Sequence, residues 1–270
     1  MYAMNDKVLR LGLIGKDVSK SISEGVHTFI LGKFGVQCQY QRFSVSSENF
    51  DDAMRTLMGD FDAFNVTIPY KREVFSYLNE IKDDAMQCGA VNTVITQTGV
   101  GYNTDGMGFL LMLQTSDVDV AGKRVLVLGV GGAGRSVAVA LKNAGAQVFI
   151  YRRNQQELQE TCEQLGVLAA NSPTQGGFDI LVNCTGVGMH DTEGISPVDA
   201  SAFAGASVAV DLIYYPKQSA FLRIADGLGL QTVNGESMLF YQAYYADCLF
   251  LGKTPNQAEA KALYKQYLAQ

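Results

Sequence analysis

Short apolar runs and longer amphipathic stretches alternate along the first part of the chain. Apolar runs with strand character cover residues 7–14, 39–45 and 61–68, and the stretches between them, residues 25–34 and 47–58, have the spacing of helices with one apolar face. Alternating strands and helices are typical of a sheet whose strands are connected by helices. The pattern therefore predicts an α/β fold for this part of the chain.

A second series of elements is predicted in the later part of the chain. Residues 91–102 form two apolar runs around Thr98-Gly99, which predicts a β-hairpin between the two series. The apolar run Val125–Leu128 then predicts a buried parallel strand, because such strands are covered on both faces. Further strands are predicted at 147–151, 180–183 and 208–212, and helices at 135–143, 155–165, 219–226, 237–250 and 257–268.

Length, composition and charge narrow the class of protein. A chain of 270 residues can form two compact domains, and 47% hydrophobic and 18% charged residues are typical of a globular protein. A formal net charge of −6 and a pI near 5.0 disfavour nucleic acid and anionic membranes as partners, because neither is attracted to an acidic surface. Residues 1–10 lack the pattern of a signal sequence and no long apolar run follows, so we expect a cytoplasmic protein.

Few residues are available for metal or thiol chemistry. The five cysteines are odd in number and widely spaced, so we expect reduced thiols in the core rather than disulfides or a zinc site. The chain has two histidines, His27 and His190, which are few for a histidine-based metal centre or a catalytic triad. We therefore expect no metal. If the protein is an enzyme, other residues must move the protons.

A glycine-rich segment follows the predicted strand at Val125–Leu128 and precedes a predicted helix. In this position it fits the G-x-G-x-x-G fingerprint, whose glycines permit a tight turn and a close approach of pyrophosphate to the helix N-terminus. A turn of this kind can also serve close packing alone. The residues predicted to bind a dinucleotide here are Gly129, Gly131, Gly132, Ala133 and Gly134.

The segment about 20 residues after these glycines bears on the choice of cofactor. NAD-binding units usually place an acidic residue there, but this chain has Arg152 and Arg153. Guanidinium groups form charge-assisted, forked contacts to phosphate, so the pair predicts NADP with its 2′-phosphate. The alternative is that both arginines are ordinary surface charges.

Two other segments place polar groups at predicted strand ends. Asn65 and Thr67 lie in a strand that Pro69 ends, and ligands of α/β sheets usually bind at such ends. Lys71 follows, but a lone lysine is most often a surface charge. Asp105 could be a simple helix cap.

Several sequence blocks, in order over nearly the whole chain, resemble the shikimate dehydrogenase family. An ordered set of this length is not expected by chance. The blocks are Gly12–Gly15 with Ser21-Ile22-Ser23, then Asn65–Lys71, Gly89–Thr93, Asn103–Gly106, Asn183–Met189, Asp211–Pro216, and finally Gly235, Met238 and Gln242.

The resemblance implies a reaction and a set of site residues. The reaction is the NADP-dependent, reversible reduction of 3-dehydroshikimate to shikimate at C3, a step of aromatic amino acid biosynthesis through chorismate. Lys71 is implied to be catalytic, with Asp105 as its partner. The implied substrate-binding residues are Ser21 and Ser23, which hold the carboxylate, and Asn65, Thr67, Asn92, Tyr214 and Gln242. Further cofactor-binding residues are implied at Thr185, Leu212, Gly235 and Met238.

The resemblance also implies two domains with a cleft between them. Residues 1–105, completed by the C-terminal helices at 237–270, would form the α/β substrate-binding domain. Residues 106–236 would form the Rossmann-like NADP-binding domain. The expected partner is a small-molecule substrate, with no nucleic acid and no membrane. A homodimer stays open, because the oligomeric state cannot be read from the sequence.

The chain departs from the pattern of the family at several positions. Lys20 stands where histidine is common, Glu24 where proline is common, and Glu236-Ser237 where an apolar–Gly pair is usual. The closing helices lack tryptophan. A quinate/shikimate dehydrogenase or a divergent paralogue acting on a related cyclitol is therefore an alternative. A sensing module without turnover and a folate-type dehydrogenase are two more, disfavoured by Lys71 with Asp105 and by the two serines, respectively.

Overall fold

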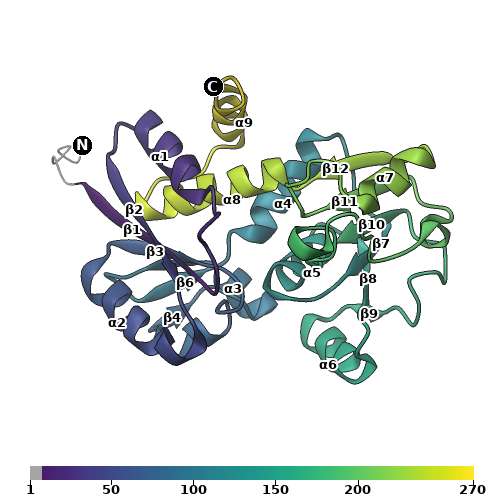
Figure 1. Ribbon diagram of the computed structural model, residues 1–270, viewed down its shortest axis with the longest axis horizontal. Helices are drawn as coiled ribbons and strands as arrows, with labels where there is room; N and C mark the ends of the chain where they lie inside the picture. Colours follow the sequence, from purple (N-terminus) through teal and green to yellow (C-terminus); the bar gives the residue numbers. More distant parts are fainter. Residues whose placement is uncertain (1–7) are drawn as a thin grey trace. The chain divides into compact units, whose positions relative to one another are not determined.

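The computed structural model describes residues 8–270, which divide into two compact units (Figure 1). One unit is Met1–Thr104 with Phe240–Gln270, described from residue 8 onward, and the other is Asp105–Leu239. Each unit contains one six-stranded sheet. The start of the first predicted strand, Lys7, and most of the segment considered for a signal sequence lie outside the described residues.

The sheet of the first unit has the strand order β2-β1-β3-β5-β6-β4. Its first three strands are parallel, and β5 and β6 form the predicted hairpin, whose turn contains Gly99 with a φ of 67°. The strands are β1 (Leu9–Gly15), β2 (Cys38–Ser44), β3 (Ala63–Val66), β4 (Glu80–Ile81), β5 (Thr93–Ile95) and β6 (Val100–Tyr102).

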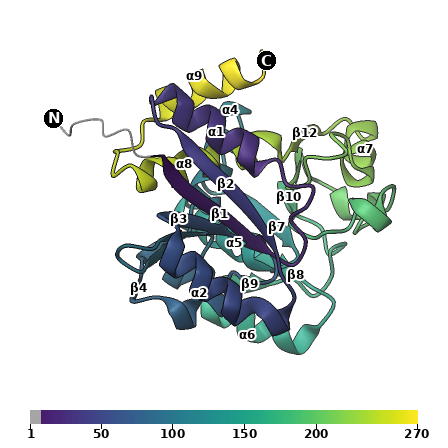
Figure 2. The same ribbon diagram turned by 60° about the vertical axis from the view of Figure 1, so that its left-hand side comes forward.

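Helices cover both faces of this sheet, as Figures 1 and 2 show for α1 and α2. On one face, Leu11 and Leu13 pack with Leu31 of α1 and with Phe250 at the end of α8. On the other face, strand residues pack with α2 and the segment after β3. The helices are α1 (Ser23–Lys33), α2 (Phe50–Asp60) after a 3₁₀ turn (Ser47–Asn49), a 3₁₀ helix (Glu73–Tyr77), α3 (Asp83–Cys88), α8 (Glu236–Phe250), which begins in the other unit, and α9 (Gln257–Tyr267).

The sheet of the second unit is entirely parallel and has the order β12-β11-β10-β7-β8-β9. The chain builds outward from β7 through β8 to β9, then returns to the other side of β7 for β10, β11 and β12. This is the doubly wound order of dinucleotide-binding folds, and it confirms the predicted Rossmann-like fold. The strands are β7 (Arg124–Leu128), β8 (Gln147–Tyr151), β9 (Leu168–Ala169), β10 (Ile180–Asn183), β11 (Val208–Asp211) and β12 (Gln231–Asn234).

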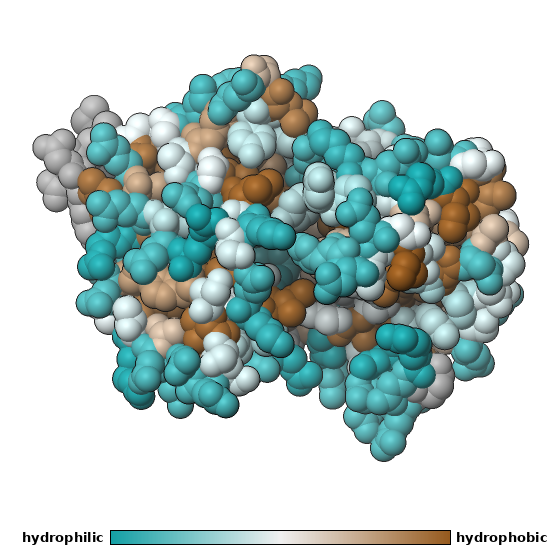
Figure 3. Space-filling model, viewed as in Figure 1, coloured by the Kyte–Doolittle hydropathy of each residue, from teal (hydrophilic) through white to brown (hydrophobic). Residues whose placement is uncertain are grey.

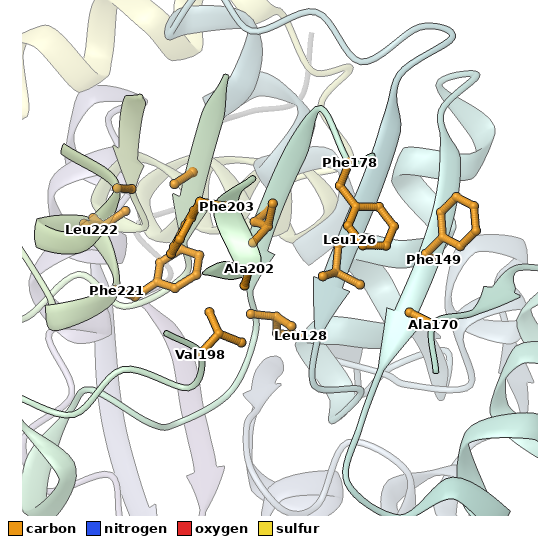
Figure 4. Packing of buried hydrophobic residues seen from close by; sticks show 13 residues of the cluster. Leu126, Leu128, Phe149, Ala170, Phe178, Val198, Ala202, Phe203, Phe221 and Leu222 are labelled. Carbon is orange, nitrogen blue, oxygen red and sulfur yellow. The ribbon is translucent and has the colours of Figure 1, made fainter. Parts of the chain in front are cut away.

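The core of the second unit shows why its strands read as continuous apolar runs. Both faces of β10 and β11 are buried, as a parallel sheet with two covered faces requires. On one face, Leu126 and Leu128 belong to a cluster with Phe203 and Phe221, whose ring centroids are 5.0 Å apart (Figure 4). The helices of this unit are α4 (Asp105–Thr115), α5 (Gly132–Asn143), α6 (Gln155–Leu165) and α7 (Ala220–Gly227), with 3₁₀ turns at His190–Thr192 and Ala200–Phe203.

Several sequence predictions need correction. The predicted helix at 135–143 begins earlier, at Gly132, because the glycine segment itself forms its first turn. The predicted strand at 61–68 ends at Val66. Strand β12 was not predicted, because it has four residues of which Val233 alone is buried. The short elements β4, α3 and β9 and the helix α4 were not predicted either.

One face of the described molecule is largely polar. Hydrophilic side chains predominate on the face that Figure 3 shows, and apolar groups form small patches between them. None of the helices within residues 8–270 has the length and hydrophobicity needed to cross a membrane.

Candidate active site

The turn from β7 into α5 is closely packed against the loop that follows β10. Gly129 has a φ of 85°, a left-handed value that glycine adopts without strain. A Cβ atom at Gly129 would lie 2.7 Å from Cγ2 of Thr185, and one at Gly134 would lie 2.3 Å from the carbonyl oxygen of Gly129. Both positions must therefore be glycine for the backbone to make this turn.

Gly131 differs from these two glycines because no protein atom fills the space beside it. It is the N-cap residue of α5, and a Cβ atom there would have no neighbour within 4 Å among the described residues. The first turn of α5 provides backbone N–H groups, and a glycine N-cap has no side chain that could accept hydrogen bonds from them. A pyrophosphate needs both N–H donors and open space, and the two occur together at this turn. The arrangement therefore favours dinucleotide binding over a role in close packing alone.

The two arginines after β8 differ in their surroundings. Arg152 forms an ion pair with Glu157 of α6, and its side chain is 29% exposed. The carboxylate of Glu157 also accepts a hydrogen bond from Nδ2 of Asn154 at 2.7 Å, and Asn154 caps α6 by accepting from the N–H of Glu157. Arg153 is exposed. A phosphate that binds Arg152 therefore has to compete with Glu157.

A buried network supports the loops after β10 and β11. Asp211 is fully buried, and it accepts hydrogen bonds from Nδ2 of Asn183 at 3.0 Å, the N–H of Ile213 at 3.0 Å and Oγ of Ser219 at 2.5 Å. Asn183 in turn accepts from the N–H and the hydroxyl of Thr185, at 3.0 and 2.6 Å. Burial raises the pKa of Asp211, while the three hydrogen bonds oppose that rise. The network fixes Thr185 beside the glycine turn.

The loops after β11 and β12 also approach each other closely. A Cβ atom at Gly235 would lie 2.0 Å from the carbonyl oxygen of Leu212, and the N–H of Gly235 donates to the carbonyl of Ile213 at 3.1 Å. Tyr214 follows in the same loop, and burial raises the pKa of its phenol. Met238 is buried in the first turn of α8. The structure therefore places Leu212, Tyr214 and Gly235 on two adjoining loops.

The two serines predicted to bind the carboxylate lie together at the start of α1. The hydroxyl of Ser21 donates to the hydroxyl of Ser23 at 3.0 Å, and the N–H of Ser23 donates to Oγ of Ser21 at 3.3 Å. Arg42 of β2 holds their loop by donating to the carbonyls of Ser19 at 2.7 Å and Ser21 at 3.4 Å. The hydroxyl pair is thus fixed at a helix N-terminus, where an anion is favoured.

Asn65 lies at the end region of β3 and is buried. Its Nδ2 group donates to the carbonyl of Asn92 and to Oγ1 of Thr93, both at 3.3 Å, and its Oδ1 accepts from the hydroxyl of Tyr40 at 3.0 Å. Thr67 follows β3, and its N–H donates to the carbonyl of Ile14 at 2.9 Å. Asn65 and Asn92 are therefore neighbours, as their predicted shared role requires.

Gln242 of α8 joins this group from a distant part of the sequence. Nδ2 of Asn92 donates to Oε1 of Gln242 at 3.4 Å and to Oγ1 of Thr104 at 2.9 Å. Oδ1 of Asn92 accepts from the N–H of Thr104 at 2.9 Å. Three predicted substrate-binding residues, Asn65, Asn92 and Gln242, are thus linked through consecutive contacts in one unit.

Lys71 and Asp105 are both buried, with exposures of 8% and 5%. The backbone carbonyl of Lys71 accepts a hydrogen bond from the N–H of Val91 at 2.7 Å, which places Lys71 beside the segment that carries Asn92. Because it is buried, Lys71 is not an ordinary surface charge. Burying an ammonium group is costly unless it is partnered. Asp105 is the first residue of α4.

Of the residues that depart from the family pattern, Lys20 and Glu24 are exposed, and Glu236 and Ser237 are partly exposed. Glu24 pairs with Arg42 across 3.6 Å between Oε2 and Nε. Glu236 pairs with Lys217 at 3.1 Å. Glu24 thus contacts the same arginine that holds the serine loop.

Several residues of these networks, among them Tyr40, Asn183 and Asp211, had no role predicted from the sequence. Asn183 and Asp211 carried a signal, because each is a polar residue that ends an apolar strand. Tyr40 carried none, since an aromatic residue in a strand is most often part of the core. Among residues 8–270, no group of three or more His, Cys, Asp or Glu side chains could hold a metal ion.

Comparisons with known proteins cover nearly the whole chain. A family model described as the shikimate dehydrogenase substrate binding domain matches residues 13–94. A shikimate dehydrogenase (NADP(+)) from Carboxydothermus hydrogenoformans is 36% identical over 93% of this chain and 95% of its own.

Solved structures of similar proteins have the same fold. The shikimate 5-dehydrogenase from Thermus thermophilus, solved in complex with NADP(H) and shikimate, has a TM-score of 0.87 and 33% identity over 96% of this chain and 99% of that chain. A chorismate mutase/shikimate 5-dehydrogenase fusion protein from Clostridium acetobutylicum has a TM-score of 0.89 and 34% identity over 97% and 98% of the two chains.

Proposed function

Because the chain belongs to the shikimate dehydrogenase family, we propose that it catalyses the NADP-dependent, reversible reduction of 3-dehydroshikimate to shikimate. The observation that carries the proposal is that Lys71 is buried and that its backbone binds the segment carrying Asn92, which contacts Asn65 and Gln242. A buried primary amine and a set of linked hydrogen-bonding side chains in one unit suit a polyhydroxylated substrate with a reacting carbonyl.

Lys71 is the proton donor in this proposal. Bound NADPH supplies the hydride for C3. The ammonium group of Lys71 hydrogen-bonds the C3 oxygen, stabilises the negative charge that develops on it and gives it a proton. The carboxylate of Asp105 is the partner that keeps Lys71 oriented. In the oxidation of shikimate, the same lysine accepts the proton of the C3 hydroxyl.

Hydrogen-bonding side chains hold the remainder of the substrate. The hydroxyls of Ser21 and Ser23 bind the carboxylate, and the N-terminus of α1 favours its negative charge. The other predicted residues bind the ring hydroxyls, since amide and hydroxyl groups can both donate and accept hydrogen bonds. These residues are Asn65, Thr67, Asn92, Tyr214 and Gln242.

The cofactor-binding residues divide by the part of NADP that they meet. Gly129, Gly131 and the first turn of α5, formed by Gly132, Ala133 and Gly134, receive the pyrophosphate. Arg152 and Arg153 receive the 2′-phosphate. The nicotinamide end is assigned to the loops after β10, β11 and β12, through Thr185, Leu212 and Gly235, and to Met238 in the first turn of α8.

Two further properties belong to the same proposal. The enzyme acts in the cytoplasm, consistent with its acidic surface and the small polar molecules that it binds. A homodimer is proposed as its assembly, and light scattering coupled to size-exclusion chromatography distinguishes a dimer from a monomer.

A single spectrophotometric experiment tests both substrate and cofactor. Shikimate and quinate are each oxidised with NADP⁺ and with NAD⁺, and the formation of the reduced nicotinamide is followed by its absorbance. We expect the highest kcat/KM with shikimate and NADP⁺. A higher value with quinate would replace the proposed substrate, and no turnover with any pair would overturn the proposed activity.

A further inference from the structure

The hydroxyl of Tyr40 contacts a residue that the proposed function uses. Tyr40 lies in the middle of β2, and 9% of the residue is exposed. Its hydroxyl donates to Oδ1 of Asn65 at 3.0 Å. The phenol therefore binds directly to the side-chain amide at the end of β3.

This contact decides which way the amide of Asn65 faces. Both amide hydrogens are used, because Nδ2 donates to the carbonyl of Asn92 and to Oγ1 of Thr93. If the amide turned over, Oδ1 would face the carbonyl oxygen of Asn92, and the Tyr40 hydroxyl would meet an N–H donor. The Tyr40 hydroxyl thus keeps one side of Oδ1 occupied and leaves its second lone pair to a ligand.

The ring of Tyr40 stacks on His27, which is paired with the buried Asp247. The two rings have centroids 5.0 Å apart and an interplanar angle of 17°. Nδ1 of His27 lies 2.6 Å from Oδ1 of Asp247, and both residues are almost completely buried. Burial and then the charge of Asp247 raise the pKa of Tyr40 well above its ordinary value. The phenol therefore keeps its proton near neutral pH and serves as a donor.

We propose that Tyr40 is a positioning residue for substrate binding, which fixes the orientation of the Asn65 amide. The inference rests on the proposed function, because it takes Asn65 as a ligand of the ring hydroxyls. Without the phenol oxygen, the Asn65 amide loses its orientation. Binding of shikimate weakens as a result, whereas proton transfer by Lys71 and binding of NADP do not depend on this contact.

The test compares Tyr40→Phe with a matched control, Tyr244→Phe. Phenylalanine keeps the ring and its stacking on His27, so the Tyr40 variant should fold. Tyr244 is also a fully buried phenol of the same unit, and it hydrogen-bonds the carbonyl of Asn256 at 3.1 Å and Glu259 at 2.7 Å, away from the predicted substrate residues. Both variants lose buried hydrogen bonds, so both should lower the melting temperature.

Steady-state kinetics separates positioning from stability. We expect Tyr40→Phe to raise KM for shikimate about threefold to tenfold, the effect of losing one hydrogen bond, with kcat and KM for NADP⁺ close to wild type. Tyr244→Phe should leave all three constants unchanged. If Tyr40→Phe kept the wild-type KM for shikimate, Tyr40 would be a core residue only and the inference would be overturned.

A double-mutant cycle with Asn65→Ala tests whether Tyr40 acts through Asn65. Asn65→Ala alone should raise KM at least as much as Tyr40→Phe, and adding Tyr40→Phe to it should change KM little further. Fully additive effects, or a wild-type KM for Asn65→Ala, would contradict the inference. A wild-type enzyme that does not oxidise shikimate would instead overturn the proposed function, so the two failures are distinguishable.

Discussion

Nδ2 of Asn92, in the segment before β5, donates to Oε1 of Gln242 in α8 at 3.4 Å, across 150 residues of sequence. The contact closes a group of side chains that begins at Asn65 and includes Thr104. Lys71 lies next to this group, because its carbonyl accepts from Val91. Helix α8 thus adds a residue to the predicted site, whose other residues come from the first part of the chain. Predictions for the site can be tested one residue at a time.

Replacing Lys71 with alanine should reduce kcat strongly. Loss of general acid–base catalysis typically costs about 10²- to 10⁴-fold in rate, and KM for NADP⁺ should change little. Asp105→Asn should act in the same direction. Arg72→Ala is the matched control, because Arg72 is the neighbouring cation and is exposed. A Lys71 variant that turned over near the wild-type rate would show that another group supplies the proton.

Removing either hydroxyl of the serine pair should weaken substrate binding. Hydrogen bonds to charged groups contribute about 1.5–3 kcal/mol, so Ser21→Ala and Ser23→Ala should each raise KM for shikimate roughly tenfold or more. Ser19→Ala is the control, since the Ser19 hydroxyl donates to Asp17 and is exposed. Wild-type KM values in both variants would mean that the carboxylate is held elsewhere, for example by Lys20.

Arg152→Ala should raise KM for NADPH and leave KM for NADH nearly unchanged. We expect Arg152 to be the chief contact of the 2′-phosphate and Arg153 to assist it. A charge-assisted contact is worth about 1.5–3 kcal/mol when well formed, or tenfold discrimination and somewhat more, and the difference should narrow as ionic strength rises. Equal losses for both cofactors would show that Arg152 contacts the adenine or supports the fold.

Glu157→Gln should strengthen the binding of NADPH. The substitution removes the negative charge that pairs with Arg152 but keeps an oxygen for Nδ2 of Asn154. Exposed ion pairs are worth about 0.2–1 kcal/mol, so the Kd for NADPH should fall by about fivefold at most, and the Kd for NADH should not. Glu160→Gln on the same helix removes the same charge without touching Arg152, and it should have no effect. Calorimetric titration measures both constants.

Alanine substitutions at two glycines of the turn after β7 should affect different properties, cofactor affinity in one case and stability in the other. Gly131→Ala should leave thermal stability near wild type, because a Cβ atom there meets no described atom, but it should weaken NADPH binding by about tenfold or more by blocking the approach to charged oxygens. Gly134→Ala should destabilise the fold by about 1–3 kcal/mol, because its Cβ atom would lie 2.3 Å from the carbonyl oxygen of Gly129. Normal NADPH affinity in a folded Gly131 variant would contradict the assignment of the pyrophosphate to this turn.

Most of the second unit could be predicted from the sequence, because its signals are local. A parallel strand buried on both faces reads as an apolar run, and β7, β8 and β10 were predicted with nearly their observed bounds. The glycine turn was recognisable because its chemistry is local as well. The short edge strands β9 and β12 were not, since two to four residues with few buried side chains carry no periodic pattern.

The sequence by itself determined the α/β class, the glycine turn at the start of α5, the basic pair after β8 and the residue types of the site. Only the tertiary structure decided that Lys71 is buried, that Gln242 contacts Asn92, that Glu157 pairs with Arg152 and that Tyr40 donates to Asn65. The physical reason is that burial and side-chain hydrogen bonds depend on which segments pack together. Tyr40 and Asn65 become neighbours only when the strands pair, and Asn92 and Gln242 only when α8 packs against the first unit. No local spacing in the sequence indicates either contact.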